Sequence, residues 1–278
     1  MLTLTTEQFQ RFAKLIYEHS GIRLDDRKMT LLSRRLKPRL EATGIDNVDR
    51  YYQLVRCKNG KVELVKLLTA VTTNETSFYR TQPHFDWFQN DFLKEVWQQH
   101  ARGQRPPRLR IWSAACSTGA EPYSLAICLE EKQFKSPPWD VFLLGTDLSE
   151  DALEAARTAR YRSRVLESFP QEKLNRHFRE VEGLIPEFEL RNDFRERVTF
   201  ERHNLMNPIR HAAFDCIFLR NVLIYFDTDS KQQVLRQIAN ALVPGGYLVI
   251  GPSEGIYGLE NPLVKLKTFL YRKKEAAK

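Results

Sequence analysis

A change of pattern near residue 108 is the feature that most constrains how this chain folds. Beyond it, short apolar runs alternate with segments of helical periodicity, which is typical of a parallel sheet with helices on both faces. Strands are predicted at 109–113, 141–145, 214–219 and 247–251, and helices at 121–132, 149–160 and 229–242. We therefore expect residues 108–278 to form an α/β domain with a doubly wound sheet.

The first 80 residues show helical patterns alone. Thr6 is a candidate N-cap for a first helix. Further helices are predicted at 28–42, 48–57 and 61–71. This pattern predicts a helical N-terminal domain over residues 1–80. A helix over roughly 82–101 and a turn at 102–107 then predict a connecting segment over 81–107.

Residues 176–203 interrupt the alternation of strands and helices. Phe188, Leu190, Val198 and Phe200 have near-alternating polar neighbours, and Gly183 marks a turn. We predict a small antiparallel sheet in this stretch, ending in a strand at 198–203.

Composition excludes several classes of protein. The 278 residues are 42% hydrophobic and 28% charged, as in an ordinary globular protein of about two domains. Apolar runs such as 216–219 are far shorter than the ~20 residues that span a bilayer. The N-terminus lacks the basic-then-apolar pattern of a secretory signal. We therefore expect a cytoplasmic protein without direct membrane insertion.

Cysteine and histidine usage predicts no metal site. The four cysteines, Cys57, Cys116, Cys128 and Cys216, form no Cys-x-x-Cys pair, and the six histidines form no His-x-x-x-His pair. Reduced thiols are expected in place of disulfides.

Positive charge is concentrated at the N-terminus. Residues 1–80 hold 15 Lys and Arg against nine Asp and Glu, and so carry six of the eight net charges. A basic N-terminal third favours an acidic partner, which can be a nucleic acid, a membrane surface or an acidic protein face.

The loops that follow the predicted strands are the candidate binding site, because ligands of open α/β sheets bind at the carboxyl ends of the strands. The first strand leads into small residues at 113–124, where Gly119 is the only glycine, so no Gly-x-Gly-x-x-Gly pattern is present. Asp147 ends the second strand and can accept both hydroxyls of a ribose, although a role at the start of the next helix is also open. Asn204 and Leu205 suit the edge and face of an adenine.

Two further segments need interpretation. Ser136-Pro-Pro-Trp139 is similar to the signature of methyltransferases that act on the amino groups of adenine or cytosine, but it precedes the second strand rather than following the fourth. A loop is therefore the better interpretation. The segment 72–80 places Asn74, Thr76 and Arg80 between an apolar helix and an aromatic pair, and taken alone it is also consistent with a turn.

Taken together, these segments resemble the chemotaxis receptor methyltransferases, the CheR-type enzymes. The resemblance rests on Thr73-Asn-Glu-Thr-Ser-Phe-Tyr-Arg80, Thr118-Gly-Ala-Glu-Pro-Tyr-Ser124 and Leu219-Arg-Asn-Val-Leu-Ile-Tyr-Phe-Asp227, together with the strand end at Asp147, all in family order. It covers nearly the whole chain. It implies a small all-α N-terminal domain followed by a Rossmann-like class I S-adenosylmethionine-dependent methyltransferase domain with a small antiparallel β-subdomain.

The resemblance also implies a function and a set of site residues. CheR-type enzymes methylate glutamate side chains of bacterial chemoreceptors with S-adenosylmethionine as cofactor and no metal. The implied cofactor contacts are Asn74, Thr76, Arg80, Glu121, Asp147, Asn204, Leu205, Leu219 and Arg220. Arg80 and Tyr225 are implied to lie nearest the transferred methyl group, as the candidate catalytic residues.

The basic helix then gains an expected partner. At a helical repeat of 100° per residue, Lys28, Arg35 and Arg39 lie within about 40° of one another, with Arg27 and Arg34 on the adjoining side. Because receptor methylation regions are Glu-rich helices, we expect this cationic stripe to dock there, although a solvated basic face is the simpler alternative. Residues 179–185 look short for the turn that grips a receptor's C-terminal pentapeptide in some family members, so direct action on the methylation helices is favoured.

Two alternative functions stay open at this point. A nucleic-acid methyltransferase is consistent with the basic N-terminal domain, but the misplaced Pro-Pro-Trp segment and the lack of a base-stacking motif argue against it. A nucleotide-sensing adaptor without turnover is the other alternative, and the presence of both Arg80 and Tyr225 argues against that.

Overall fold

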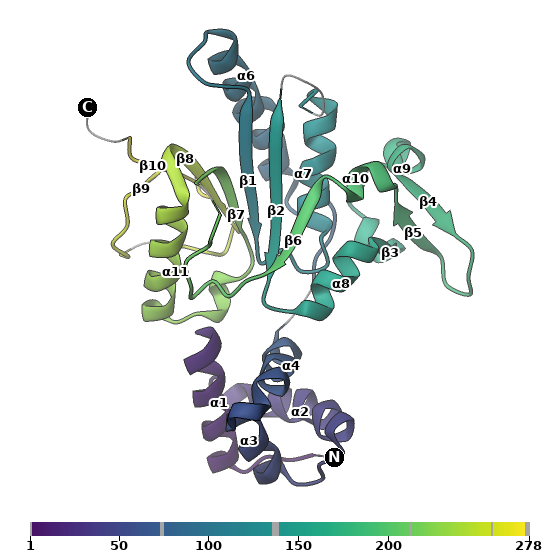
Figure 1. Ribbon diagram of the computed structural model, residues 1–278, viewed down its shortest axis with the longest axis vertical. Coiled ribbons are helices and arrows are strands. Elements are labelled where there is room, and N and C mark those ends of the chain that lie inside the picture. The colour runs from purple at the N-terminus through teal and green to yellow at the C-terminus, as the bar shows by residue number, and fades with distance from the viewer. Residues whose placement is uncertain (1, 73–74, 135–138, 212, 257, 276–278) are drawn as a thin grey trace.

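The computed structural model describes residues 2–72, 75–134, 139–211, 213–256 and 258–275 (Figure 1). Its N-terminal part is helical, as predicted. The helices are α1 (Thr6–Ser20), η1 (Asp26–Lys28), α2 (Met29–Thr43), α3 (Val48–Arg56), η2 (Lys58–Gly60) and α4 (Lys61–Val71). The N-cap of α1 is Thr5 rather than Thr6, and its side chain and that of Gln8 form a reciprocal capping box. Phe12, Leu36 and Leu67 are fully buried between these helices.

A nearly continuous helix connects the two parts of the chain. It consists of α5 (Gln82–Trp87), a π-helical turn η3 (Phe88–Phe92) and α6 (Leu93–Ala101), which together match the predicted 82–101. Phe85 and Phe88 pack against Phe218 of the main sheet, and Phe92 packs against Tyr247. The connecting helix is therefore part of the sheet's hydrophobic core.

The main sheet has seven strands in the order β6-β2-β1-β7-β8-β10-β9. They are β1 (Arg108–Ala114), β2 (Asp140–Asp147), β6 (Val198–Arg202), β7 (Phe214–Leu219), β8 (Leu242–Ile250), β9 (Leu263–Lys265) and β10 (Leu270–Lys273). The first five strands in that order are parallel, whereas β10 runs antiparallel to β8 and β9. The chain order reverses beside β1, so the loops after β1, β2 and β7 meet at one edge.

Helices cover both faces of this sheet, as the predicted α/β fold requires. Alternate residues of a strand point to opposite faces. Trp112 and Leu219 lie in the core that α11 (Thr228–Ala241) covers, whereas Ile111 and Phe218 lie in the core that α7 (Ala120–Glu131) covers. The remaining main-sheet helix, α8 (Glu150–Thr158), lies between β2 and the small sheet in the chain.

The predicted boundary of the small sheet was wrong at both ends. The sheet has the order β3-β5-β4, formed by β3 (Arg160–Arg162), β4 (Phe178–Val181) and β5 (Glu187–Leu190). Between and after these strands lie η4 (Ser163–Leu166), α9 (Gln171–His177) and α10 (Asn192–Arg195). Its extent is therefore 160–190, not 176–203. β6 belongs to the main sheet, where it pairs with β2 in parallel. Because β6 is an edge strand and only partly buried, its apolar and polar residues alternate as they do in an antiparallel strand, which explains the wrong prediction.

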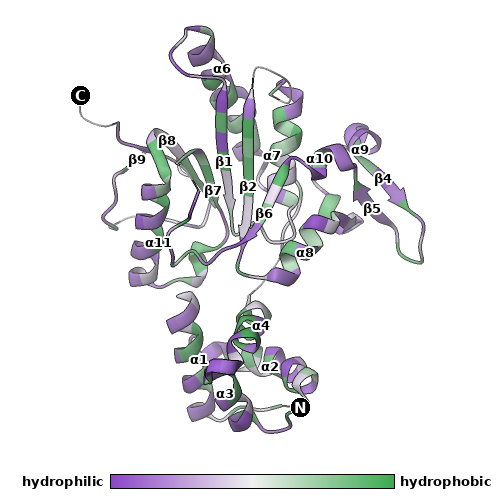
Figure 2. Cartoon of the chain, in the orientation of Figure 1, coloured by the Kyte–Doolittle hydropathy of each residue, from purple (hydrophilic) through white to green (hydrophobic). Residues whose placement is uncertain are grey.

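The hairpin of β4 and β5 extends away from the rest of the molecule. Its strands alternate charged and apolar residues, and apolar residues also lie in its turn (Figure 2). Leu184 and Ile185 in that turn are solvent-exposed.

The helical domain lies beyond the carboxyl edge of the strands (Figure 1). Hydrogen bonds join it to the α/β domain. The Asn204 side-chain amide donates to the carbonyl of His19 at 2.7 Å, the Arg23 amide donates to the carbonyl of Tyr225 at 2.9 Å, and Ile22 forms an antiparallel bridge with Phe226. The helical domain thus covers the edge where the sheet's loops gather. In the described part of the chain no helix is both long enough and apolar enough to cross a membrane.

Candidate active site

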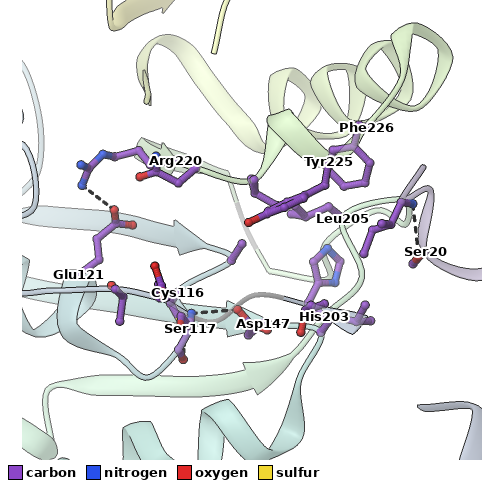
Figure 3. A pocket seen from close by; sticks show the side chains of 18 of the residues that line it. Ser20, Cys116, Ser117, Glu121, Asp147, His203, Leu205, Arg220, Tyr225 and Phe226 are labelled. Carbon is purple, nitrogen blue, oxygen red and sulfur yellow. Dashed lines mark hydrogen bonds and ion pairs between the residues drawn. The ribbon is translucent and has the colours of Figure 1, made fainter. Parts of the chain in front are cut away.

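A pocket lies between the carboxyl edge of the sheet and the helical domain. Eight of the predicted site residues line it: Thr76, Arg80, Glu121, Asp147, Asn204, Leu205, Arg220 and Tyr225. Figure 3 shows the side chains of several of them converging on one space. Because these residues come from segments up to about 150 positions apart, the fold alone brings them together.

The loop after β1 has an unusual backbone. Ala115, Ser117 and Gly119 all have positive φ angles, of 63°, 52° and 85°. Such angles are costly for non-glycine residues and persist where the surroundings enforce them. A side chain at Gly119 would bring its Cβ within 2.8 Å of the Ala156 Cβ, so the loop packs closely on α8. The backbone of this loop is therefore fixed by its packing, and its residues 115–117 line the pocket.

Asp147 holds this loop and faces the pocket. Its Oδ2 accepts from the Ser117 amide at 2.8 Å (Figure 3). Its Oδ1 accepts from the Ser149 amide at 2.9 Å. Burial raises the pKa of Asp147, while the backbone N–H donors around it act in the opposite direction. A carboxylate has about four lone-pair sites, so Asp147 retains capacity for hydroxyl donors in the pocket.

Glu121 and Arg220 form a buried ion pair across the pocket wall. The Arg220 Nη1 donates to Glu121 Oε2 at 2.8 Å, and the Ser113 hydroxyl donates to Glu121 Oε1 at 2.7 Å. The Arg220 side chain is 3% exposed, lies over the ring of Phe85 and also donates to the carbonyl of Arg80. Burial lowers the pKa of the Arg220 guanidinium, which the charge of Glu121 opposes.

Arg80 and Tyr225 line the same pocket. Arg80 lies between α4 and α5, and Tyr225 lies between β7 and α11. The Arg80 Nη1 donates to the carbonyl of Glu75 at 3.0 Å, and the side chain is partly exposed. The Tyr225 hydroxyl points into the space between Arg220 and Asp147 (Figure 3). The ammonium of Lys28 lies 6.0 Å from the centroid of the Tyr225 ring.

Comparisons with known proteins identify the architecture. The all-alpha domain model of the CheR methyltransferase family matches residues 7–72, and the SAM-binding domain model of that family matches residues 74–271. The chain belongs to the CheR methyltransferase family. This confirms the resemblance drawn from the motifs at 73–80, 118–124 and 219–227.

Individual relatives agree with this assignment. The chain is 36% identical to a chemotaxis protein methyltransferase of Salmonella typhimurium, over 93% of this chain and 87% of the relative. It is 35% identical to the Escherichia coli chemotaxis protein methyltransferase, over 94% and 88%. It is 30% identical to that of Borreliella burgdorferi, over 94% and 92%. The fold is therefore the expected all-α domain followed by a SAM-binding methyltransferase domain.

Some predicted contacts of this CheR-family methyltransferase need correction. The side chain of Leu219 does not line the pocket: it is fully buried in the α11 core, because alternation along β7 turns it into the sheet's interior. Asn204 lines the pocket, but its amide donates to His19 and its oxygen accepts from the Met206 amide at 3.0 Å. Both ends of Asn204 are thus engaged by protein. Asn74 lies outside the described residues.

Arg39 was wrongly placed in the docking stripe. It makes a two-point ion pair with Glu63, at 2.9 and 2.7 Å, and its side chain is only 19% exposed. Tyr51 donates to the same carboxylate at 2.8 Å. Arg39 is therefore a structural group of the helical domain, whereas Arg34 is exposed and Arg35 is partly exposed.

The structure adds pocket residues that the sequence reasoning missed. Cys116, Ser117 and His203 lie next to predicted strand ends. The rule that ligands bind after the strands therefore marks them as candidates too. Burial raises the pKa of the Cys116 thiol and lowers the pKa of His203, so both are neutral near pH 7. Ser20 and Ile22 also line the pocket, but they come from the helical domain and no local pattern marks them.

Within the described residues, no group of three or more His, Cys, Asp or Glu side chains is arranged to hold a metal ion.

Proposed function

We propose that this protein transfers the methyl group of S-adenosylmethionine to glutamate side-chain carboxylates in the cytoplasmic methylation helices of bacterial chemoreceptors. The product is a glutamyl methyl ester, which tunes receptor signalling and adaptation. The observation that carries the proposal is one pocket of a CheR-family fold that combines a buried carboxylate, Asp147, with Arg80 and Tyr225. Relatives named chemotaxis protein methyltransferases support the assignment to a chemosensory pathway.

The donor set fits the proposed cofactor. Asp147 follows β2 and can accept from the ribose hydroxyls. Leu148, Leu205 and Val222 supply apolar surface for an adenine. Glu121, already paired with Arg220, retains carboxylate capacity for the amine of the methionyl part. When bound, S-adenosylmethionine supplies an electrophilic methyl group.

The acceptor needs no general base. A glutamate side chain has an unperturbed pKa of about 4.3, so it is already a carboxylate at neutral pH. What remains for the protein is to align that carboxylate in line with the methyl group and to exclude water. Arg80 can orient the carboxylate oxygens with its fork of donors, and Tyr225 can donate one hydrogen bond from its hydroxyl. We therefore assign positioning of the acceptor to these two residues.

Receptor docking is proposed on the exposed part of the basic stripe. Arg34 and Arg35 lie on α2, and Lys28 precedes it beside Tyr225, so the stripe leads toward the pocket. Because Arg39 pairs with Glu63, the proposed docking residues are Lys28, Arg34 and Arg35. A cationic surface near the pocket steers an acidic helix toward it, an effect that weakens as salt rises.

Tethering to a receptor's C-terminal pentapeptide is not proposed. The turn between β4 and β5 spans residues 182–186 and is short. We expect direct action on the methylation helices.

A methyl-transfer assay tests the proposal. Purified protein and labelled S-adenosylmethionine are mixed with receptor cytoplasmic fragments, with and without their C-terminal tails, and with DNA and RNA in separate reactions. We expect label in the receptor fragments that mild alkali releases as methanol, equally with and without tails. Label in nucleic acid, or alkali-stable label in protein, would contradict the proposed function.

A further inference from the structure

Glu254 lies outside the pocket yet binds the loop that forms one of its walls. The residue is 3% exposed, and it follows β8 in the segment Gly251-Pro-Ser-Glu254. Its carboxylate accepts four backbone N–H groups: Oε2 accepts from Asn221 at 2.6 Å and Gly251 at 2.8 Å, and Oε1 accepts from Val222 at 2.7 Å and Leu223 at 2.6 Å. Three of these donors belong to the segment that joins Arg220 to Tyr225.

The loop held by Glu254 begins with a left-handed residue and turns several backbone N–H groups toward one acceptor. Asn221 has a φ of 58°, in the left-handed region. Three successive N–H groups, those of residues 221–223, point to one side and are satisfied together by one carboxylate. Buried N–H groups require acceptors, and an ionised carboxylate is the strongest one available in a protein.

This loop fixes the site residues on either side of it. Arg220, just before it, pairs with Glu121, and Tyr225, two residues after it, carries its hydroxyl into the pocket. The carbonyl of Tyr225 is held from the other side by the Arg23 amide of the helical domain. The loop is thus attached at one end to Glu254 of the sheet and at the other end to the helical domain.

We infer that Glu254 is a positioning residue for methyl transfer, acting through the 221–223 backbone on the orientation of Tyr225. This inference rests on the proposed role of Tyr225. Glu254 does not line the pocket, so the role we assign to it is indirect. The Asp147 side of the cofactor site is held separately, by Ser117 and Ser149. Of the residues proposed to contact the adenine, only Val222 belongs to the loop that Glu254 holds. Loss of Glu254 should therefore affect turnover more than cofactor affinity.

Two variants disturb this contact in different ways. Glu254→Gln keeps the size of the side chain but replaces one acceptor oxygen with an N–H donor facing backbone N–H groups. Gly251→Ala keeps the carboxylate, but its new Cβ would press on Glu254 Oε2 and displace it. Asp215→Asn is the matched control. Asp215 lies at the opposite end of β7, accepts from the Arg110 amide at 2.8 Å and from Arg105 at 2.9 Å, and is likewise largely buried.

The test compares kcat, the Kd of S-adenosylhomocysteine, thermal stability and amide hydrogen exchange for the full chain and the three variants. For Glu254→Gln and Gly251→Ala we expect kcat to fall about 10- to 100-fold, since misplacement of order 1 Å costs that much. We expect the Kd to rise less than about 3-fold, because the other binding contacts stay. Asp215→Asn should lose stability with kcat nearly unchanged. Amides 221–223 should exchange faster in the first two variants only.

Several results would overturn the inference. One is a folded Glu254→Gln protein with near-normal kcat, and another is a loss of kcat in all three variants in proportion to lost stability. Unchanged exchange at 221–223 would also overturn it, and this measurement needs no acceptor. Failure of the proposed function is seen separately, as absent methyl transfer by the unmodified protein. If Glu254→Gln does not fold, Gly251→Ala decides by the same criteria.

Discussion

The guanidinium of Arg220 donates to the carboxylate of Glu121 at 2.8 Å inside the protein, where the Arg220 side chain is 3% exposed. Arg220 follows β7 and Glu121 lies in the first turn of α7, so the pair joins two neighbouring segments at the sheet's carboxyl edge. Both residues line the pocket. The pair therefore links the stability of the fold to the shape of the site.

Breaking this pair should cost both stability and cofactor affinity. Arg220→Met leaves Glu121 buried without its cation, and we expect the free energy of unfolding to fall by about 3–5 kcal/mol. Denaturant unfolding with and without S-adenosylhomocysteine measures both effects. Arg110→Met is the control: Arg110 pairs with Asp140, whose side chain is 65% exposed, at the other end of the strands. That change should cost less than about 1 kcal/mol and leave binding of S-adenosylhomocysteine unchanged. Equal losses of stability and of S-adenosylhomocysteine binding in both variants would contradict a special role for the pair of Arg220 and Glu121.

Arg80→Ala should lower turnover strongly. The variant removes the donors proposed to orient the acceptor carboxylate, and the partly exposed position of Arg80 means that folding should be preserved. Initial rates of receptor methylation, with thermal unfolding as the check on folding, measure the effect. We expect Arg80→Lys to recover only part of the rate, because a lysine lacks the planar fork. Near-normal methylation by Arg80→Ala would remove Arg80 from the mechanism.

Gly119→Ala should damage the cofactor site through sterics. The residue has a φ of 85°, and the new Cβ would lie 2.8 Å from the Ala156 Cβ. Gly44→Ala provides the matched control, since Gly44 has a φ of 67° but its new Cβ would meet no described group within 4 Å. Both variants should lose about 1 kcal/mol from the left-handed backbone, but only Gly119→Ala should weaken binding of S-adenosylhomocysteine. Titration calorimetry distinguishes the two, and normal binding by Gly119→Ala would show that the loop tolerates the shift.

Charge reversal should separate docking from structure within the basic helix. Arg34→Glu with Arg35→Glu should slow receptor methylation and reduce its salt dependence, while the free energy of unfolding changes little. Arg39→Ala should instead destabilise the helical domain by about 1–3 kcal/mol, because it leaves the buried Glu63 without its cation and with the hydrogen bond from Tyr51. Methylation rates at several salt concentrations and denaturant unfolding provide the two readouts. Unchanged rates and salt dependence in the double variant would exclude docking through this face.

Stability should decline on mild acidification. His84 is 1% exposed and stacks on Phe269, and burial lowers the pKa of His84 to about 3. In the unfolded chain this histidine binds a proton around pH 6.5, whereas in the folded protein it stays neutral to about pH 3. The stability that neutral His84 contributes is therefore full well above pH 6.5 and is lost as the pH falls through 6.5. From this residue alone the free energy of unfolding should drop by about 2 kcal/mol between pH 8 and pH 5.

Unfolding curves from pH 5 to 8 measure this decline in stability. His84→Phe preserves the stacking and should flatten the pH dependence. An equally steep dependence in that variant would place its origin elsewhere, for example at His177, whose pKa burial also lowers.

The sequence by itself determined most of the elements and much of the site. Strand and helix positions follow from local periodicity and capping, so β1, β2, β7 and the helical first third lie where the patterns predicted them. Asp147 and Glu121 were found because side chains after parallel strands necessarily share one edge of the sheet. These inferences need only short-range information and a rule of topology.

Tertiary structure alone decided the rest. Whether Arg39 faces a receptor or pairs with Glu63, 24 positions away, depends on how α2 packs against α4. Ile22 lines the pocket although it comes from the helical domain. The N–H groups of residues 221–223 likewise donate to a distant residue, Glu254. Buried charges and backbone N–H groups find whichever partners the packed fold brings within hydrogen-bond reach, and no local pattern in the chain encodes that proximity.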